Sequence, residues 1–265
     1  MLLRIRDRAA FAATGGRAHV PGQPCVAFVH GAGFNHEAWA LQSRWFAFHG
    51  CNVLAVDLPG HGRSEGEPLD SVAALAGWLL ELLDAAGARR ARLVGHSMGS
   101  LVCLEAAAAE PRCIERLALI GAAAAMKVHP DLLAAARASE HSAIDMINLW
   151  GHGPAVLGGS RAPGIYMAGV GERILEQARP GVLHADLALC DAYGDALERA
   201  ARIRAPTLLV SGTRDQMTPL KGARRLSDAI AGSRLVAVEG AGHMLMAERP
   251  DELLQALAPH LRAAQ

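Results

Sequence analysis

The sequence predicts an α/β fold in which a mostly parallel sheet carries helices on both of its faces. Short apolar runs alternate along the 265 residues with longer segments of helical pattern. Nearly every run is stopped by glycine or a polar group, which is typical of strands that are buried on both faces. Strands that alternate with helices in this way form parallel βαβ units with right-handed crossovers.

The predicted parallel strands are the apolar runs at 24–30, 51–60, 91–97, 115–123, 205–215 and 233–243. The first 20 residues differ, because two short runs and a Gly15-Gly16 turn indicate an antiparallel hairpin at one edge. Helical patterns cover 69–87, 100–111, 219–232 and 249–264. The first of these helices offers Asp70 or Ser71 as its N-cap and Gly87 as its stop.

One long segment, residues 122–204, interrupts the alternation. It shows helical patterns and a glycine-rich stretch, "GHGPAVLGGSRAPG", but no clear parallel strand. An insertion of this length is too large for an ordinary loop. We therefore expect a core domain formed by 1–121 and 205–265, and a helical cap subdomain formed by 122–204, set over one end of the sheet.

Composition narrows the class of protein. Lys and Arg total 26, as do Asp and Glu, a balance that argues against nucleic-acid or membrane partners. No apolar run approaches the roughly 20 residues of a transmembrane helix, and the N-terminus lacks the pattern of a signal peptide. The five scattered cysteines are expected to be buried and reduced, which fits a cytoplasmic protein. No metal-binding spacing is present. The sequence does not determine the oligomeric state, which can be a monomer or a homodimer.

The stretch "LVGHSMGSL" at 93–101 points to a nucleophile. It places Gly-x-Ser-x-Gly between a strand and a helix, which is the pattern of a nucleophile elbow. Gly95 and Gly99 would leave room for a tight turn that exposes the hydroxyl of Ser97. The alternative is that Ser97 simply caps a helix.

A serine needs a base, and the base needs a group that orients it. Asp215 ends a predicted strand in "LLVSGTRD", and His243 follows the last strand in "VEGAGH". Together with Ser97 they lie at the carboxyl ends of parallel strands, where open α/β sheets place their sites. The sequence thus predicts a Ser97, Asp215 and His243 triad.

Backbone donors for an oxyanion are expected at two turns. One is the N–H of Met98, directly after the nucleophile, and the other is the N–H of Ala32 in "VHGAGF", with Gly33 as the next candidate. We expect His30 to hold this turn structurally. His96 is also expected to be structural, with its side chain pointing away from that of Ser97.

The motifs "HGAG", "DLPGHGRSEG", "GHSMGS", "GTRDQMTP" and "GAGHMLMAERP" occur in this order over nearly the whole chain. In this combination the chain resembles the α/β-hydrolase superfamily, in the branch with a serine nucleophile. The resemblance implies an eight-stranded, mostly parallel sheet with a cap between strands six and seven, and assigns the nucleophile, acid and base to Ser97, Asp215 and His243. It gives Asp57 a structural role.

The superfamily hosts many reactions, so the fold does not settle the chemistry. The serine argues against haloalkane dehalogenases and epoxide hydrolases, which use an aspartate. We expect a cofactor-free hydrolase that cleaves a carboxylic ester of a small or medium substrate through an acyl-enzyme. A C–C bond hydrolase of aromatic degradation and a slow-turnover ligand receptor are the alternatives. Haloperoxidase-like, lyase and thioesterase activities are also open.

The cap is expected to decide the substrate. Residues predicted to line the pocket are Gly33, Trp150, His152, Tyr166, Met167 and Met244. A mostly apolar pocket of this kind suits a short or medium acyl chain or a small aromatic ester. Arg161, Arg173 and Arg179 are the cap residues that could serve an anionic substrate, although arginines more often face solvent.

Overall fold

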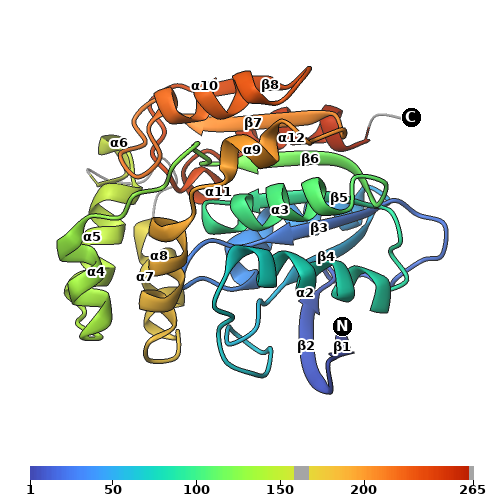
Figure 1. Ribbon diagram of the computed structural model, residues 1–265, viewed down its shortest axis with the longest axis horizontal. Helices are drawn as coiled ribbons and strands as arrows, with labels where there is room; N and C mark the ends of the chain where they lie inside the picture. Colours follow the sequence, from blue (N-terminus) through green and yellow to red (C-terminus); the bar gives the residue numbers. More distant parts are fainter. Residues whose placement is uncertain (158–166, 263–265) are drawn as a thin grey trace.

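The computed structural model describes residues 1–157 and 167–262 and contains an eight-stranded sheet in the order β1-β2-β4-β3-β5-β6-β7-β8 (Figure 1). Strands β1 and β2 form an antiparallel hairpin at one edge, β2 pairs antiparallel with β4, and all other pairs are parallel. The strands are β1 Leu2–Ile5, β2 Arg8–Ala13, β3 Cys25–Val29, β4 Asn52–Val56, β5 Ala91–His96, β6 Ile114–Ile120, β7 Thr207–Gly212 and β8 Arg234–Val238. The predicted sheet and edge hairpin are confirmed.

Helices cover both faces of the sheet because its central strands are apolar on both sides. In β3, Ala27 and Val29 face one cluster of buried side chains, whereas Val26 and Phe28 face the other. The first cluster includes residues of α2 (Val72–Ala85), α3 (Met98–Ala109) and α10 (Leu220–Ala229). The second includes residues of α1 (Ala40–Phe48) and α12 (Pro250–Arg262). Two short elements, η1 (His36–Trp39) and α11 (Leu245–Glu248), complete the core.

The helix α2 shows how local sequence sets an element. Of the two predicted caps, Ser71 is the one used, and its hydroxyl accepts the N–H of Ala74 at 3.2 Å. The helix stops before Gly87, which adopts a left-handed φ of 72°. Helix α1, by contrast, is not among the predicted elements.

In the described part of the segment between β6 and β7, the regular secondary structure is helical and is joined by turns and loops. Its helices are α4 Pro130–Arg137, α5 Ser142–Gly151, α6 Pro154–Leu157, α7 Met167–Glu176, α8 Val182–Ala192 and α9 Ala196–Ala200. Figure 1 shows α4, α5, α7 and α8 beyond the carboxyl ends of the parallel strands, whereas α9 lies beside α3. We call α4–α8 the cap. Its helices form a small apolar cluster that includes Leu132, Ile147 and Ile174, together with Phe34 and Met244 from outside the cap.

Two expectations about environment can be compared with the structure. Cys25, Cys51, Cys103, Cys113 and Cys190 are all free thiols, and all except the half-buried Cys113 are buried. Among the described helices, none has both the length and the apolar character needed to cross a bilayer.

Candidate active site

Ser97 occupies a strained turn between β5 and α3. Its backbone has φ 53° and ψ −120°, a conformation that residues other than glycine rarely adopt. Its N–H donates to the carbonyl of Ile120 at 2.9 Å. A Cβ at Gly95 would overlap the carbonyl of Gly99, and a Cβ at Gly99 would overlap the carbonyl of Val29. The two glycines are therefore needed for the close approach of backbone that makes this turn.

Asp215 and His243 form a buried hydrogen-bonded pair. The Nδ1 of His243 lies 2.9 Å from Oδ2 of Asp215. The same carboxylate accepts the N–H groups of Met217 and Thr218 at 2.9 and 2.7 Å, and the hydroxyl of Thr218 at 2.7 Å. Burial opposes ionisation of Asp215, but the charge of His243 and these hydrogen bonds outweigh it and lower the pKa of the carboxyl. Asp215 therefore stays a carboxylate that fixes the orientation of the imidazole.

Ser97 and His243 line one cavity of about 450 Å³ between the sheet and the cap. Its wall is mostly apolar, with Lys127, His129, Gln216 and Thr218 among the polar residues. The larger apolar side chains that line it are Phe34, Met126, Val128, Leu132, Ile147, Trp150, Leu187, Cys190, Met217 and Met244. Gly31 and Ala32 border it beside Ser97, since a Cβ on Gly31 would lie 3.2 Å from the Cβ of Ser97. The cavity thus brings a hydroxyl, an imidazole and the turn after β3 into one space.

Of the two predicted backbone donors, Ala32 borders this space and Met98 directly follows Ser97. Met98 is the first residue of α3, so its N–H is one of the first N–H groups of the helix, which have no carbonyl partner within it. Ala32 lies in a turn closed by the hydrogen bond from Phe34 N to Gly31 O, 3.1 Å long. We call residues 31–34 the oxyanion loop, after the role that is predicted for Ala32.

Gly33 does not line the cavity, and this corrects the prediction. Its N–H donates to Oδ2 of Asp186 in α8, at 2.8 Å, so it cannot also serve an oxyanion. Its backbone is left-handed, with φ 71°, and a Cβ would collide with Leu183 and Leu175 of the cap. Gly33 is therefore a packing contact between the oxyanion loop and the cap.

Two neighbouring histidines are buried and neutral. His30 donates from Nδ1 to the carbonyl of Gly31 at 2.9 Å and accepts the N–H of Leu58 on Nε2, as expected for a residue that holds the turn. Burial, together with the charge of His61, lowers the pKa of His30 to about 4. Burial also lowers the pKa of His96 to about 3.

His96 has the structural contact that was predicted for it. Its Nε2 donates to the carbonyl of His243 at 3.1 Å. Its ring lies 4.7 Å from the ring of His243, and the residue borders the cavity. That its side chain points away from that of Ser97 stays a prediction.

Of the predicted pocket residues, Trp150 and Met244 line the cavity. His152 does not. It is buried, and its Nδ1 bonds to the carbonyl of Asn148 at 2.9 Å, because the chain turns back toward the core where α5 ends. Tyr166 lies outside the described residues, and Met167 is the first residue of α7.

The segment that contains His152 supports the loop of the candidate base. The carbonyl of Gly151 accepts the N–H groups of His243 and Met244 at 2.8 and 3.0 Å. The carboxylate of Glu248 joins the two sides, because it accepts the N–H of Gly153 at 2.8 Å and that of Gly242 at 3.0 Å. This attachment was not predicted, although the glycines of "GHG" at 151–153 and "GAGH" at 240–243 are the signal that could have indicated it.

Few charges reach the cavity within the described part of the chain. Lys127 borders it, but the side chain is 74% exposed and its Nζ bonds to the carbonyl of Asp191 at 2.5 Å. Arg173 pairs with Glu176, and Arg179 donates to main-chain carbonyls of the core. Arg161 lies outside the described residues.

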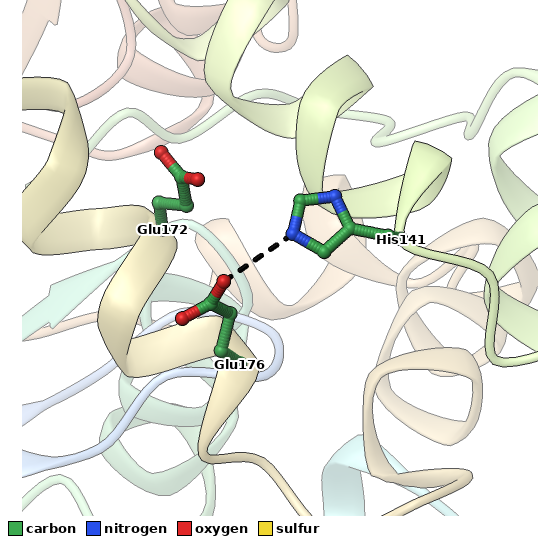
Figure 2. Close-up of side chains that lie close together, drawn as sticks. All are labelled: His141, Glu172 and Glu176. Carbon is green, nitrogen blue, oxygen red and sulfur yellow. Dashed lines mark hydrogen bonds and ion pairs between the residues drawn. The ribbon is translucent and has the colours of Figure 1, made fainter.

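A histidine and two glutamates come together on the cap surface, away from this cavity. Figure 2 shows His141 facing Glu176, with Glu172 one turn away on the same helix. His141 and Glu176 are exposed and Glu172 is half-buried. Nε2 of His141 lies 3.3 Å from Glu176, Nδ1 lies 3.4 Å from Asp145, and Arg173 also pairs with Glu176. These surface ion pairs account for the arrangement without a metal ion.

The comparisons with known proteins agree with this architecture. A family model described as "Alpha/beta hydrolase family" matches residues 26–256. A putative carbamate hydrolase RutD of Klebsiella pneumoniae is 31% identical over 234 residues, which cover 84% of this chain and 85% of the relative. The (E)-2-((N-methylformamido)methylene)succinate hydrolase of Acinetobacter baylyi is 24% identical and covers 89% of each chain. The crystal structure of the enol-lactonase from Burkholderia xenovorans superposes with a TM-score of 0.89 at 26% identity, over 99% of this chain and all of the other. The chain belongs to the alpha/beta hydrolase family.

Proposed function

We propose that the protein is a serine hydrolase that cleaves carboxylic esters of small or medium, mostly apolar substrates through an acyl-enzyme. One observation carries the proposal. Ser97, held at φ 53°, opens onto the same cavity as His243, whose Nδ1 lies 2.9 Å from the buried carboxylate of Asp215. This is the set of groups that acyl transfer requires.

In the proposed reaction, Ser97 Oγ attacks the ester carbonyl while His243 takes its proton on Nε2. Asp215 holds the other ring nitrogen and stabilises the imidazolium. The N–H groups of Ala32 and Met98 donate to the negative oxygen of the tetrahedral intermediate. The C–O bond then breaks, and His243 gives its proton to the leaving alcohol. Water attacks the acyl-enzyme by the reverse sequence, which releases the acid and restores Ser97.

The cavity supports a neutral, apolar acyl group. Apolar side chains form most of its wall, and the one lysine that borders it is exposed and bonded to Asp191. A free carboxylate in this space would find no buried cation among the described residues. The volume of about 450 Å³ suits a drug-sized or smaller ligand. The enol-lactonase among the similar structures acts, by its name, on a cyclic ester. We therefore include lactones among the candidate substrates.

The proposal is tested with p-nitrophenyl acetate, butyrate and octanoate. Wild-type protein should hydrolyse them, and Ser97→Ala should lower kcat by at least about 10⁴-fold. Ser100→Ala is a matched control, because Ser100 lies one turn along the same helix and its hydroxyl bonds to the carbonyls of Gly95 and Ile120. It should keep kcat within a few-fold.

Other outcomes separate the alternatives. Undiminished turnover by Ser97→Ala would contradict the proposal. Cleavage of a β-diketone-like ring-fission product in place of esters would favour a C–C bond hydrolase. Negligible turnover with a ligand-induced rise in Tm would favour a receptor.

A further inference from the structure

The cap helix α8 turns one face toward the oxyanion loop and the cavity. Leu183, Asp186, Leu187 and Cys190 follow the i, i+3, i+4, i+7 spacing that places side chains on one face of a helix. Leu187 and Cys190 line the cavity, and Leu183 packs against Gly33. Asp186 interrupts this apolar face and is only 1% exposed. Burying a carboxylate is unfavourable unless it is paired and hydrogen-bonded. The partners of Asp186 therefore indicate its structural role.

Both of its partners belong to the core. Oδ2 of Asp186 accepts the N–H of Gly33 at 2.8 Å and lies 2.7 Å from Nε2 of His61. Gly33 is in the oxyanion loop, and His61 follows β4. One carboxylate oxygen therefore joins the cap to two separate loops of the core.

His61 supplies the charge that makes this burial favourable. Its Nδ1 lies 3.0 Å from the carbonyl of Pro59, and its Nε2 lies against Asp186. Both neighbours accept hydrogen bonds, so both ring nitrogens carry protons and the ring is an imidazolium. Burial disfavours that charge, but Asp186 outweighs it and the pKa of His61 is raised. The adjacent ring of His30, 4.8 Å away, is neutral and adds no competing charge.

The bond to Gly33 fixes the peptide next to the candidate donor. Ala32 immediately precedes Gly33, so the Ala32–Gly33 peptide plane cannot rotate without losing the bond to Asp186. Leu183 and Leu175 of the cap also pack closely against Gly33, on the side where a Cβ would project. We infer that Asp186 is a positioning residue, through which the cap sets the direction of the Ala32 N–H toward the oxyanion. This inference rests on the proposed function, because it assigns a role in the same reaction.

A second link between the inserted segment and the core provides a matched reference. Glu105 of α3 is 7% exposed and accepts the hydroxyl of Tyr193 at 2.7 Å and Nε of Arg199 at 3.0 Å. This link is also a buried carboxylate with two partners, but none of its members lines the cavity or belongs to the oxyanion loop. Its loss should affect stability without affecting the chemical step.

The experiment compares Asp186→Ala, Asp186→Asn and Glu105→Gln in the full chain. Each variant is measured for kcat and KM with p-nitrophenyl butyrate, for the pre-steady-state rate of acylation, and for Tm. Asp186→Ala should lower kcat and the acylation rate by about 10- to 100-fold, with KM within about 3-fold, because a misplaced donor weakens transition-state stabilisation. Asp186→Asn should restore kcat to within about 5-fold, because a single oxygen accepts both bonds and an amide oxygen can do the same. Glu105→Gln should lower Tm and leave kcat unchanged.

Asp186→Leu covers the case in which the alanine variant does not fold. Leucine continues the apolar face of α8 without an acceptor, and His61 can lose its proton once the carboxylate that raises its pKa is gone, so no unpaired charge is left buried. This variant should therefore fold and still show the loss of kcat. The inference is overturned if Asp186→Ala or Asp186→Leu keeps the wild-type kcat while Tm falls, as it does in Glu105→Gln. Wild-type protein that hydrolyses no ester contradicts the proposed function and the inference with it. Active wild-type protein with an unchanged Asp186→Leu contradicts the inference alone.

Discussion

Two attachments of the cap to the core that lie beside the cavity are built differently. At the loop of His243, main chain bonds directly to main chain, because the carbonyl of Gly151 accepts the N–H groups of His243 and Met244, and the carboxylate of Glu248 supports this contact. At the oxyanion loop, the contact depends on one buried side chain, Asp186, and on the charge of His61.

The difference shows how each attachment can fail. Main-chain bonds do not depend on side-chain identity, but they require that no Cβ intervenes between the two backbones. A side-chain bond tolerates changes around it, but it is lost when one carboxylate is removed. The first attachment should therefore be sensitive to added atoms, and the second to removed atoms and to pH.

Among the variants that test this comparison, Gly242→Ala should have the largest effect on stability and kcat. A Cβ at Gly242 would lie 2.6 Å from the N of Gly153 and 2.7 Å from the carbonyl carbon of His152, and backbone on both sides cannot move aside cheaply. We expect a loss of about 1–3 kcal/mol in stability and a fall of about 100-fold in kcat, as the loop of His243 shifts. Thermal unfolding and ester kinetics measure both. His152→Ala, which removes a ring outside the cavity, should change kcat little, and equal effects of the two variants would refute the main-chain account.

Glu248→Ala should have an intermediate effect. Oε2 of Glu248 accepts the N–H groups of both Gly153 and Gly242, and Oε1 also accepts that of Gly242, so glutamine could keep both partners whereas alanine keeps neither. Leaving a buried N–H without a partner should cost about 1–3 kcal/mol for each group, measured by chemical denaturation. Glu198→Ala removes an exposed pair with Arg202 and is the control, for which we expect less than about 1 kcal/mol. A loss for Glu248→Ala no larger than the control would show that the carboxylate is not needed there.

The pH dependence of stability should separate the two attachments. The pKa of His61 is raised, so the stability that its proton contributes is fully present below the unfolded value of about 6.5 and is lost as pH rises through the folded pKa. Asp186→Asn removes the carboxylate that stabilises this proton, while His30 and Asp57 still neighbour the ring. The difference in Tm between wild type and Asp186→Asn should therefore be largest near pH 6 and narrow at alkaline pH. A difference that stayed constant from pH 6 to 10 would rule out a charged His61.

The smallest effects should come from the cavity wall. Leu187 lines the cavity and Leu183, one turn earlier in α8, does not. Leu187→Ala should raise the ratio of kcat/KM for octanoate over butyrate by about 3- to 10-fold, since each further buried CH₂ contributes about 0.8 kcal/mol. Leu183→Ala should leave this ratio unchanged. An unchanged ratio in both variants would place the acyl chain elsewhere.

Much of the fold and of the site's layout could be predicted because both depend on local pattern. The apolar runs of buried parallel strands are typically followed by glycine or a polar group, and this pattern located all six parallel strands. It also placed Ser97, Asp215 and His243 after the ends of strands. The turn at Ser97 could be predicted from its two glycines. The catalytic roles of these residues stay predictions.

The cap was harder to predict, because its contacts depend on how helices pack rather than on local pattern. His152 was expected in the pocket wall, but the glycines around it bring its backbone against the loop of His243. Asp186 was missed because an acidic residue within a helix usually faces solvent. The signal that could have found it is its place between Leu183 and Leu187 on the one apolar face of α8.

Labelling with a fluorophosphonate tests the central claim most directly, because the reagent forms a covalent bond with an activated serine and needs no knowledge of the substrate. Wild-type protein should gain one label by intact mass, the label should map to Ser97 within 93–101, and ester hydrolysis should be lost in proportion. Ser97→Ala should take up none, and His243→Ala should react far more slowly. Ester hydrolysis that survives complete labelling of Ser97, or a label on another serine, would contradict the account.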